Sequence, residues 1–146
     1  MTPDTATPSY CIADATSAMY ALQSAAFDAH LKLELEVDRM RHIPPDEPDA
    51  AAEYVASVAK RDGFTRAWEF YKQTCARHVE PGVLTCLLRF DDDMTTQFLD
   101  LAVVHDPASR PEVEFSSGVL QLSSLYAAAF ADELAYAQRL RDNPDY

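Results

Sequence analysis

No glycine or proline interrupts the chain from Ile12 to Ile43. This segment is also rich in alanine and leucine, the residues that favour a helix most. Asp14 or Thr16 can cap its start. Ile43-Pro44-Pro45 ends it, because a residue before proline is driven out of the α region. The sequence therefore predicts a helix over residues 12–42, about 45 Å long, and a mainly α fold.

Two more helices are predicted in the next part of the chain. After the proline-rich linker 43–48, a helix should start near Pro48 or Asp49, because proline suits a first helical turn. It should stop at Asp62-Gly63, a pair typical of helix ends. The third helix is predicted over residues 64–79, where apolar side chains recur at helical spacing.

Residues 83–115 leave two structures open. The run 95–105 has apolar residues at both helical and strand spacing. The preceding Asp91-Asp92-Asp93 suits a helix start or a hairpin turn equally well. We expect a helix here, and a last helix over residues 119–141, limited by Gly118. The predicted fold is an antiparallel bundle of about five helices. The alternative is an α+β fold with a short β ribbon in residues 83–115.

The 146 residues are expected to form one helical domain over residues 12–141. A flexible N-terminal tail (residues 1–11) and a C-terminal tail (residues 142–146) should flank it. The N-terminus lacks the pattern of a secretory signal, and no apolar run approaches the ~20 residues of a membrane span. Three cysteines are too few for a disulfide framework. These features favour a cytoplasmic protein that does not bind membranes.

The predicted helix 12–42 has two apolar strips separated by a polar line. The inner strip is Met19, Leu22, Ala26, Ala29, Leu33, Val37 and Met40, and the outer strip is Tyr20, Phe27, Leu31 and Leu35. This width is enough to pack on two sides, as in a homodimer. The polar line between the strips contains Gln23, His30 and Glu34, and His30 can pair with Glu34 one turn away.

This polar line defines a candidate pocket. If both strips pack, the line is partly enclosed, and His30 can serve as a ligand or an acid–base group. Polar residues of the last helix, Tyr126 and Glu133, complete the predicted pocket of Gln23, His30, Glu34, Tyr126 and Glu133. Sites of this type are built in bundle cores from facing helices.

The net charge of the chain indicates the sign of the charge that a partner should have. It has 24 Asp and Glu against 12 Lys and Arg, a net charge of −12. Such a field repels nucleic acid and anionic lipid, and it speeds the encounter with basic proteins. Two acidic groups lie on predicted connections, where binding residues concentrate. The predicted partner-binding residues are Asp46, Glu47, Asp49, Asp91, Asp92 and Asp93.

The sequence contains no motif for catalysis or phosphate binding, and three glycines leave little room for a phosphate-binding loop. Cys75-x-x-His78, Cys86 and His105 lack the compact spacing of zinc sites. We therefore expect no catalytic residues, metal or cofactor.

These observations favour an interaction protein over an enzyme. The preferred hypothesis is a small acidic cytoplasmic module that binds a basic protein by electrostatic steering and helix-face docking, as an inhibitor, immunity-type protein, chaperone or adaptor. The alternative is a small-molecule or metal-binding bundle with a pocket around His30 and Glu34. A second alternative is a DNA mimic, with acids spaced like phosphates.

Overall fold

The computed structural model describes residues 15–44, 46–80, 83–84 and 86–142. It is mainly α and contains four helices within these residues: α1 (Thr16–Arg41), α2 (Ala50–His78), α3 (Leu87–Leu101) and α4 (Arg110–Asp142). The strands β1 (Val79–Glu80) and β2 (Val83–Leu84) form a short antiparallel ribbon between α2 and α3.

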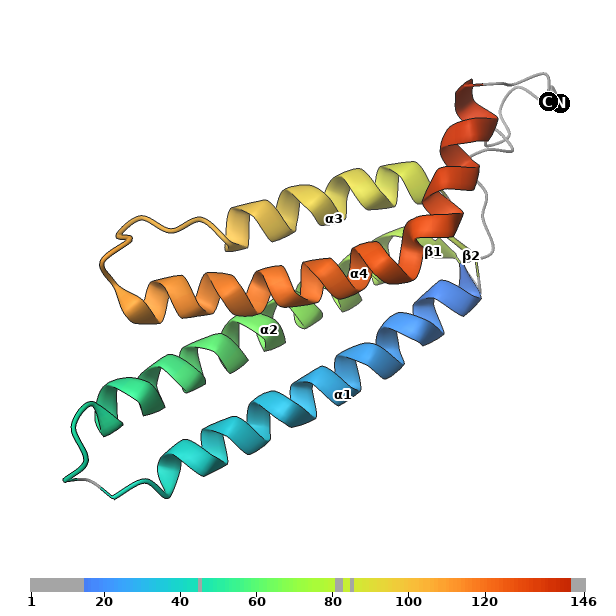
Figure 1. The fold of residues 1–146 in the computed structure, drawn as a ribbon. Coiled ribbons are helices and arrows are strands. Elements are labelled where there is room, and N and C mark those ends of the chain that lie inside the picture. Colours follow the sequence, from blue (N-terminus) through green and yellow to red (C-terminus); the bar gives the residue numbers. More distant parts are fainter. Residues whose placement is uncertain (1–14, 45, 81–82, 85, 143–146) are drawn as a thin grey trace, which may run out of the picture.

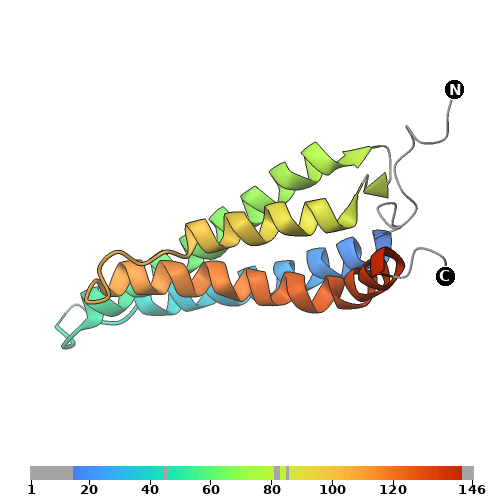
Figure 2. The same cartoon turned by 90° about the horizontal axis from the view of Figure 1, so that it is seen from above.

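The helices run antiparallel to their neighbours in sequence, and α2 and α4 form the central pair (Figure 1). Helix α1 packs against both on one side, and α3 packs against both on the other. The connections 42–49 and 102–109 lie together at one end of the molecule, which we call the loop end (Figures 1 and 2). The β1–β2 ribbon lies at the opposite end, the ribbon end.

The long first helix predicted over 12–42 is confirmed from Thr16 to Arg41, but it starts later than predicted, because Ala15 is the N-cap and no side chain caps the helix. Its inner strip faces α2 and α4, and Ala18, Leu22, Ala26, Leu33 and Val37 are buried. Arg39 and Arg41 lie in the last turn, where positive charge interacts favourably with the negative end of the helix dipole. Residues 12–14 and the predicted tail 1–11 lie outside the described residues.

Helices α2 and α4 cross where each contains a glycine. A Cβ on Gly63 would overlap the carbonyl oxygen of Phe115, and a Cβ on Gly118 would overlap that of Lys60 and lie 2.8 Å from the backbone nitrogen of Phe64. Both glycines are buried inside continuous helices. They are therefore needed for close backbone approach, which any side chain would prevent.

The prediction that Asp62-Gly63 ends a helix is wrong. Helix α2 runs through it, so the two helices expected over 49–61 and 64–79 are one, and the bundle has four helices instead of about five. Glycine lowers helix propensity by only about 1 kcal/mol, and tight packing against α4 outweighs this cost.

The last helix begins earlier than predicted, at Arg110 instead of residue 119. Ser109 provides the cap, because its hydroxyl accepts a hydrogen bond from the amide of Glu112 at 3.4 Å. Pro111 sits in the first turn, where its missing N–H costs nothing. Gly118 does not limit the helix. The helix ends at Asp142, so the predicted C-terminal tail loses this residue, and 143–146 lie outside the described residues.

Residues 87–101 are helical, as preferred, and the alternative ribbon of residues 83–115 is not formed. Residues 110–115 belong to α4, and the described pairing involves only two residues on each strand. The apolar residues of α3 that follow helical spacing, Leu87, Phe90, Met94 and Phe98, are fully or almost fully buried. The segment is therefore a helix and not a strand because its helical spacing buries these residues against α2 and α4.

An aromatic cluster fills the core on the ribbon side of the glycine crossing. Tyr126 and Phe130 of α4 have ring centroids 4.8 Å apart, and both contact Phe90 of α3 and Tyr71 of α2. Such pairs add to the apolar burial of the rings. No helix in the described part of the chain combines the length and apolar character needed to cross a membrane.

We expect Gly63→Ala or Gly118→Ala to lower the free energy of unfolding by about 2 kcal/mol or more, because the new Cβ overlaps a backbone atom that cannot move aside. Urea unfolding followed by circular dichroism measures the change. At an exposed helix position, alanine in place of glycine would instead be stabilising. Unchanged or increased stability of both variants would show that the helices do not cross at these residues. Ser124→Ala, at an exposed position of α4, is the control and should have little effect.

Candidate functional site

Two hollows lie along the line where α1 meets α2. The first, of about 340 Å³, is lined by Gln23, Ala26, Phe27, His30, Phe64, Thr65 and Trp68. The second, of about 420 Å³, is more open and lies at the loop end, lined by Met40, Arg41, Ile43, Ala50, Ala51 and Tyr54. We call them the aromatic hollow and the loop-end hollow.

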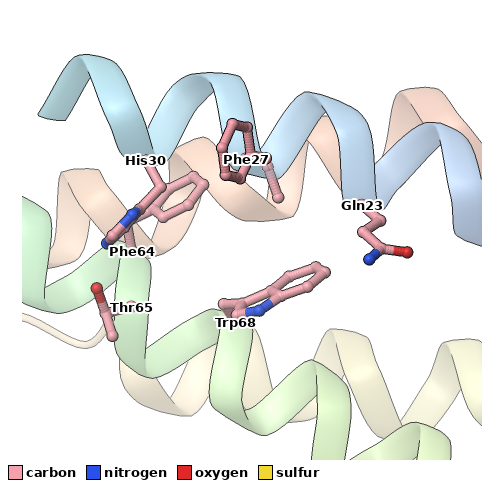
Figure 3. Close-up of a pocket in the computed structure, with 7 residues that line it drawn as sticks. Gln23, Phe27, His30, Phe64, Thr65 and Trp68 are labelled. Carbon is pink, nitrogen blue, oxygen red and sulfur yellow. The ribbon is translucent and has the colours of Figure 1, made fainter.

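The aromatic hollow has an apolar floor and a few polar groups. The indole of Trp68 extends toward the amide of Gln23, and His30 lies beside Phe64 (Figure 3). The rings of His30 and Phe64 stack with centroids 6.3 Å apart. Apolar walls with a small number of polar groups are typical of sites for small molecules. A planar molecule with one polar edge would suit this arrangement.

Glu34 connects the polar side of α1 to α2. Its carboxylate lies 3.4 Å from Nε2 of His30 and 3.4 Å from the guanidinium of Arg61. The side chains of His30 and Glu34 are 42% and 44% exposed, so this network is an open surface feature and not a buried catalytic pair. It separates the aromatic hollow from the loop-end hollow along the chain direction of α1.

The predicted pocket is thus brought together only in part. Gln23 and His30 line the aromatic hollow, with Glu34 beside His30. Tyr126 is buried in the core, where its hydroxyl donates a hydrogen bond of 2.7 Å to Asp91. Glu133 is half-buried on α4 and does not line either hollow. Sequence analysis did not assign Phe64, Thr65 and Trp68 to this site, since it could not tell which helix packs beside Gln23.

The predicted partner-binding acids separate into two groups. Asp46, Glu47 and Asp49 are exposed at the loop end, whereas Asp91, Asp92 and Asp93 lie in α3 near the ribbon end (Figure 1). The two groups do not form one patch. None of the loop-end acids lines the loop-end hollow, but their connection joins the two helices whose ends do.

Asp93 is engaged inside the protein. Its carboxylate accepts hydrogen bonds from Arg77 at 3.1 Å and Gln97 at 2.7 Å, and it lies 3.0 Å from Nε2 of His78. Gln97 also donates to the buried hydroxyl of Thr74, at 2.9 Å. This network joins the end of α2 to α3. Of the three predicted partner-binding acids on α3, Asp92 is exposed, and Asp91 and Asp93 are partly buried.

The contacts of Asp93 shift its pKa downward. Partial burial acts in the opposite direction, but the hydrogen bonds from His78, Arg77 and Gln97 together outweigh it. Burial raises the pKa of the Cys75 thiol, which keeps it protonated. Burial and the bond to Asp91 both raise the pKa of Tyr126.

Among the described residues, no three His, Cys, Asp or Glu side chains are close enough to hold a metal ion. Cys86 precedes α3 and His105 follows it, so the length of that helix separates them. The chain matches no family model, no curated protein and no solved structure.

We expect Asp93→Asn to lower the free energy of unfolding by about 1 kcal/mol at neutral pH, because it removes a charged acceptor shared by three groups and partial exposure limits the loss. The folded-state pKa lies below the unfolded one. The stabilisation is therefore present above about pH 4 and disappears as the pH falls through the folded-state pKa. Urea unfolding at a series of pH values measures it. Asp92→Asn is the control, and an equal effect of both variants would contradict a specific role for Asp93.

Proposed function

We propose that this protein is an interaction module that binds a basic protein partner at its loop end. The observation that carries the proposal is that Asp46, Glu47 and Asp49 are exposed on the connection between the two helices whose ends line the loop-end hollow. Apart from Arg41, that hollow is lined by Met40, Ile43, Ala50, Ala51 and Tyr54. A partner segment with an apolar side chain flanked by Lys or Arg fits both features. The apolar group enters the hollow, and the cations face the acids.

The charge of the loop end supports this partner. The connections 42–49 and 102–109 contain Asp46, Glu47, Asp49 and Asp106 but no Lys or Arg. The neighbouring Arg110 is already paired with Glu53, with N–O distances of 2.5 and 2.9 Å. Arg41 lines the loop-end hollow and offsets one of these four negative charges, so the loop end keeps a net negative charge that can steer a basic molecule before contact.

The backbone at Asp49 suits a rigid site. This residue has φ of 65°, in the left-handed region that Asp and Asn adopt more readily than most residues, and its carbonyl accepts the first hydrogen bond of α2, from Glu53. The helix start thus fixes the backbone from which this carboxylate extends. Asp49→Asn should keep the backbone while removing the charge.

The test uses a labelled synthetic helical peptide of Lys and Leu. We expect the triple variant Asp46→Asn, Glu47→Gln, Asp49→Asn to bind it about 10-fold more weakly at about 50 mM salt, and the difference to shrink at about 300 mM salt. Fluorescence anisotropy measures the binding. A peptide with Gln in place of Lys should bind weakly to both proteins.

The matched control is the triple variant Glu69→Gln, Asp92→Asn, Asp132→Asn, which removes the same charge from exposed positions on α2, α3 and α4. It should change the affinity less than about 3-fold. If both triple variants weaken binding equally, the peptide senses only net charge, and the loop end is not a binding site. The finer roles of inhibitor, immunity-type protein, chaperone or adaptor depend on the partner that this site selects.

A second candidate function is supported by the aromatic hollow. Its volume lies within the range of ligand sites, and three of its seven lining residues are aromatic. The ligand would be a small planar aromatic molecule, held between Phe64 and Trp68 with its polar edge toward Gln23 or His30. This candidate keeps the predicted small-molecule class but replaces Tyr126 and Glu133 with residues of α2.

Trp68 provides the measurement, because it is the one tryptophan of the chain and lines the hollow. Added 2-naphthoate should quench its fluorescence with saturation. Ala26→Leu and Thr65→Leu fill the hollow from opposite walls, and each should weaken binding about 10-fold. Ala128→Leu, exposed on α4, is the control. Quenching that none of the three variants changes would exclude binding in this hollow.

A further inference from the structure

The outer strip of α1 is apolar and exposed. Tyr20 is 69% exposed, Phe27 70%, Leu31 49% and Leu35 60%. Their spacing places them on one face over about 22 Å of helix. Together they expose on the order of 400 Å² of apolar side chain, an area that in soluble proteins usually marks an interaction site.

Most of the area of this strip is left uncovered by the described residues, although Phe27 also lines the aromatic hollow. Helix α1 uses its opposite face to contact α2 and α4, where Leu22, Ala26 and Val37 are buried. Helix α1 lies outside the central pair, so one of its sides faces no other helix (Figure 1). The sequence predicts two packing faces on this helix, and α2 and α4 cover one of them.

The charge of α1 sets it apart from the rest of the chain. From Thr16 to Arg41 it has four acids against three Lys and Arg, a net charge of −1 in a chain of −12. Repulsion between two copies is therefore small where their α1 helices meet and larger for most other approaches. A nearly neutral apolar face suits a second copy better than a strongly basic partner.

Two charged residues along the edge of the strip fix a register. Asp28 and Lys32 are exposed, one turn apart, and neither has an ion-pair partner among the described side chains. In an antiparallel pair with a two-fold axis near residues 29–30, Asp28 faces Lys32 of the second copy, and the contact occurs twice. The same pairing places Phe27 against Leu31 of the second copy. A parallel pair would bring like charges together.

We infer that the protein self-associates through the outer strip of α1, as an antiparallel α1–α1 dimer with reciprocal Asp28–Lys32 pairs. The apolar strip supplies about half of the ~800 Å² per partner of a standard interface, and its polar edges supply most of the rest. Interfaces of this size have dissociation constants from about micromolar to picomolar, and we expect this one at the weak end, on the order of micromolar.

Sedimentation equilibrium of the full chain tests the surface. We expect the native protein to dimerise, and Phe27→Ser with Leu31→Ser to weaken the dimer at least 10-fold. The control, Leu99→Ser, changes a 61% exposed leucine on α3 and should leave the dimer intact. A native protein that stays monomeric at about 100-fold above micromolar concentration would overturn the inference and leave the strip to a different protein. Equal effects of Leu99→Ser and the α1 variant would place the interface elsewhere.

Charge exchange tests the register. Asp28→Lys alone and Lys32→Asp alone place four like charges together, and each should weaken the dimer at least 10-fold. An equal mixture of these two single variants should form a heterodimer, and the double variant Asp28→Lys, Lys32→Asp should dimerise like the native chain. Single variants that dimerise normally, or a double variant that does not, would overturn the antiparallel pairing.

These variants leave the loop-end acids untouched, so the proposed partner binding is measured separately with the same proteins. The Lys–Leu peptide should bind the monomeric α1 variants with native affinity. Loss of the dimer and loss of peptide binding are therefore independent results.

Discussion

The close contact of α2 and α4 at Gly63 and Gly118 determines where everything else lies. When two helices pack with their backbones in contact, no third helix fits between them. Helices α1 and α3 therefore occupy opposite sides of the central pair, and each packs against both of its helices. Toward the ribbon end the aromatic rings of Tyr71, Phe90 and Tyr126 fill the space beside the crossing. The exposed strip on α1 and the hollows between α1 and α2 both follow from this arrangement.

The sequence predicted the helical class, the length of α1 and its inner strip, because an uninterrupted helical period is a local signal. It failed at Gly63 and Gly118, where the local meaning of glycine is a helix end. Glycine is needed at both positions because the backbone of another helix lies too close for a side chain, and no local sequence pattern shows this contact. The number of helices was wrong for this single reason. The choice between helix and ribbon in residues 87–101 also depended on packing, since both periods were present.

The candidate site shows the same limit for charge. Composition identified the acidic groups, but it could not distinguish an acid that serves the fold from one that faces solvent. Asp93 is held by Arg77 and Gln97, whereas Asp46 and Glu47 are exposed. Likewise the polar line on α1 was visible from helical spacing, and Gln23 and His30 do line a hollow. The residues of its other wall, Phe64 and Trp68, could not be predicted, because the sequence does not show that α2 packs beside α1 there.

The two proposed surfaces differ in the force that acts on them. The loop end has more acids than cations, so attraction of a basic partner depends on long-range charge and is weakened by salt. The outer strip of α1 is nearly neutral and apolar, so its burial depends mainly on the hydrophobic effect. Added salt also screens the repulsion between two chains of charge −12. Because a dimer through α1 would leave both loop ends at the outer ends of the paired helices, one assembly would present two acidic sites. Binding of a multivalent basic partner would then gain from avidity without any new contact.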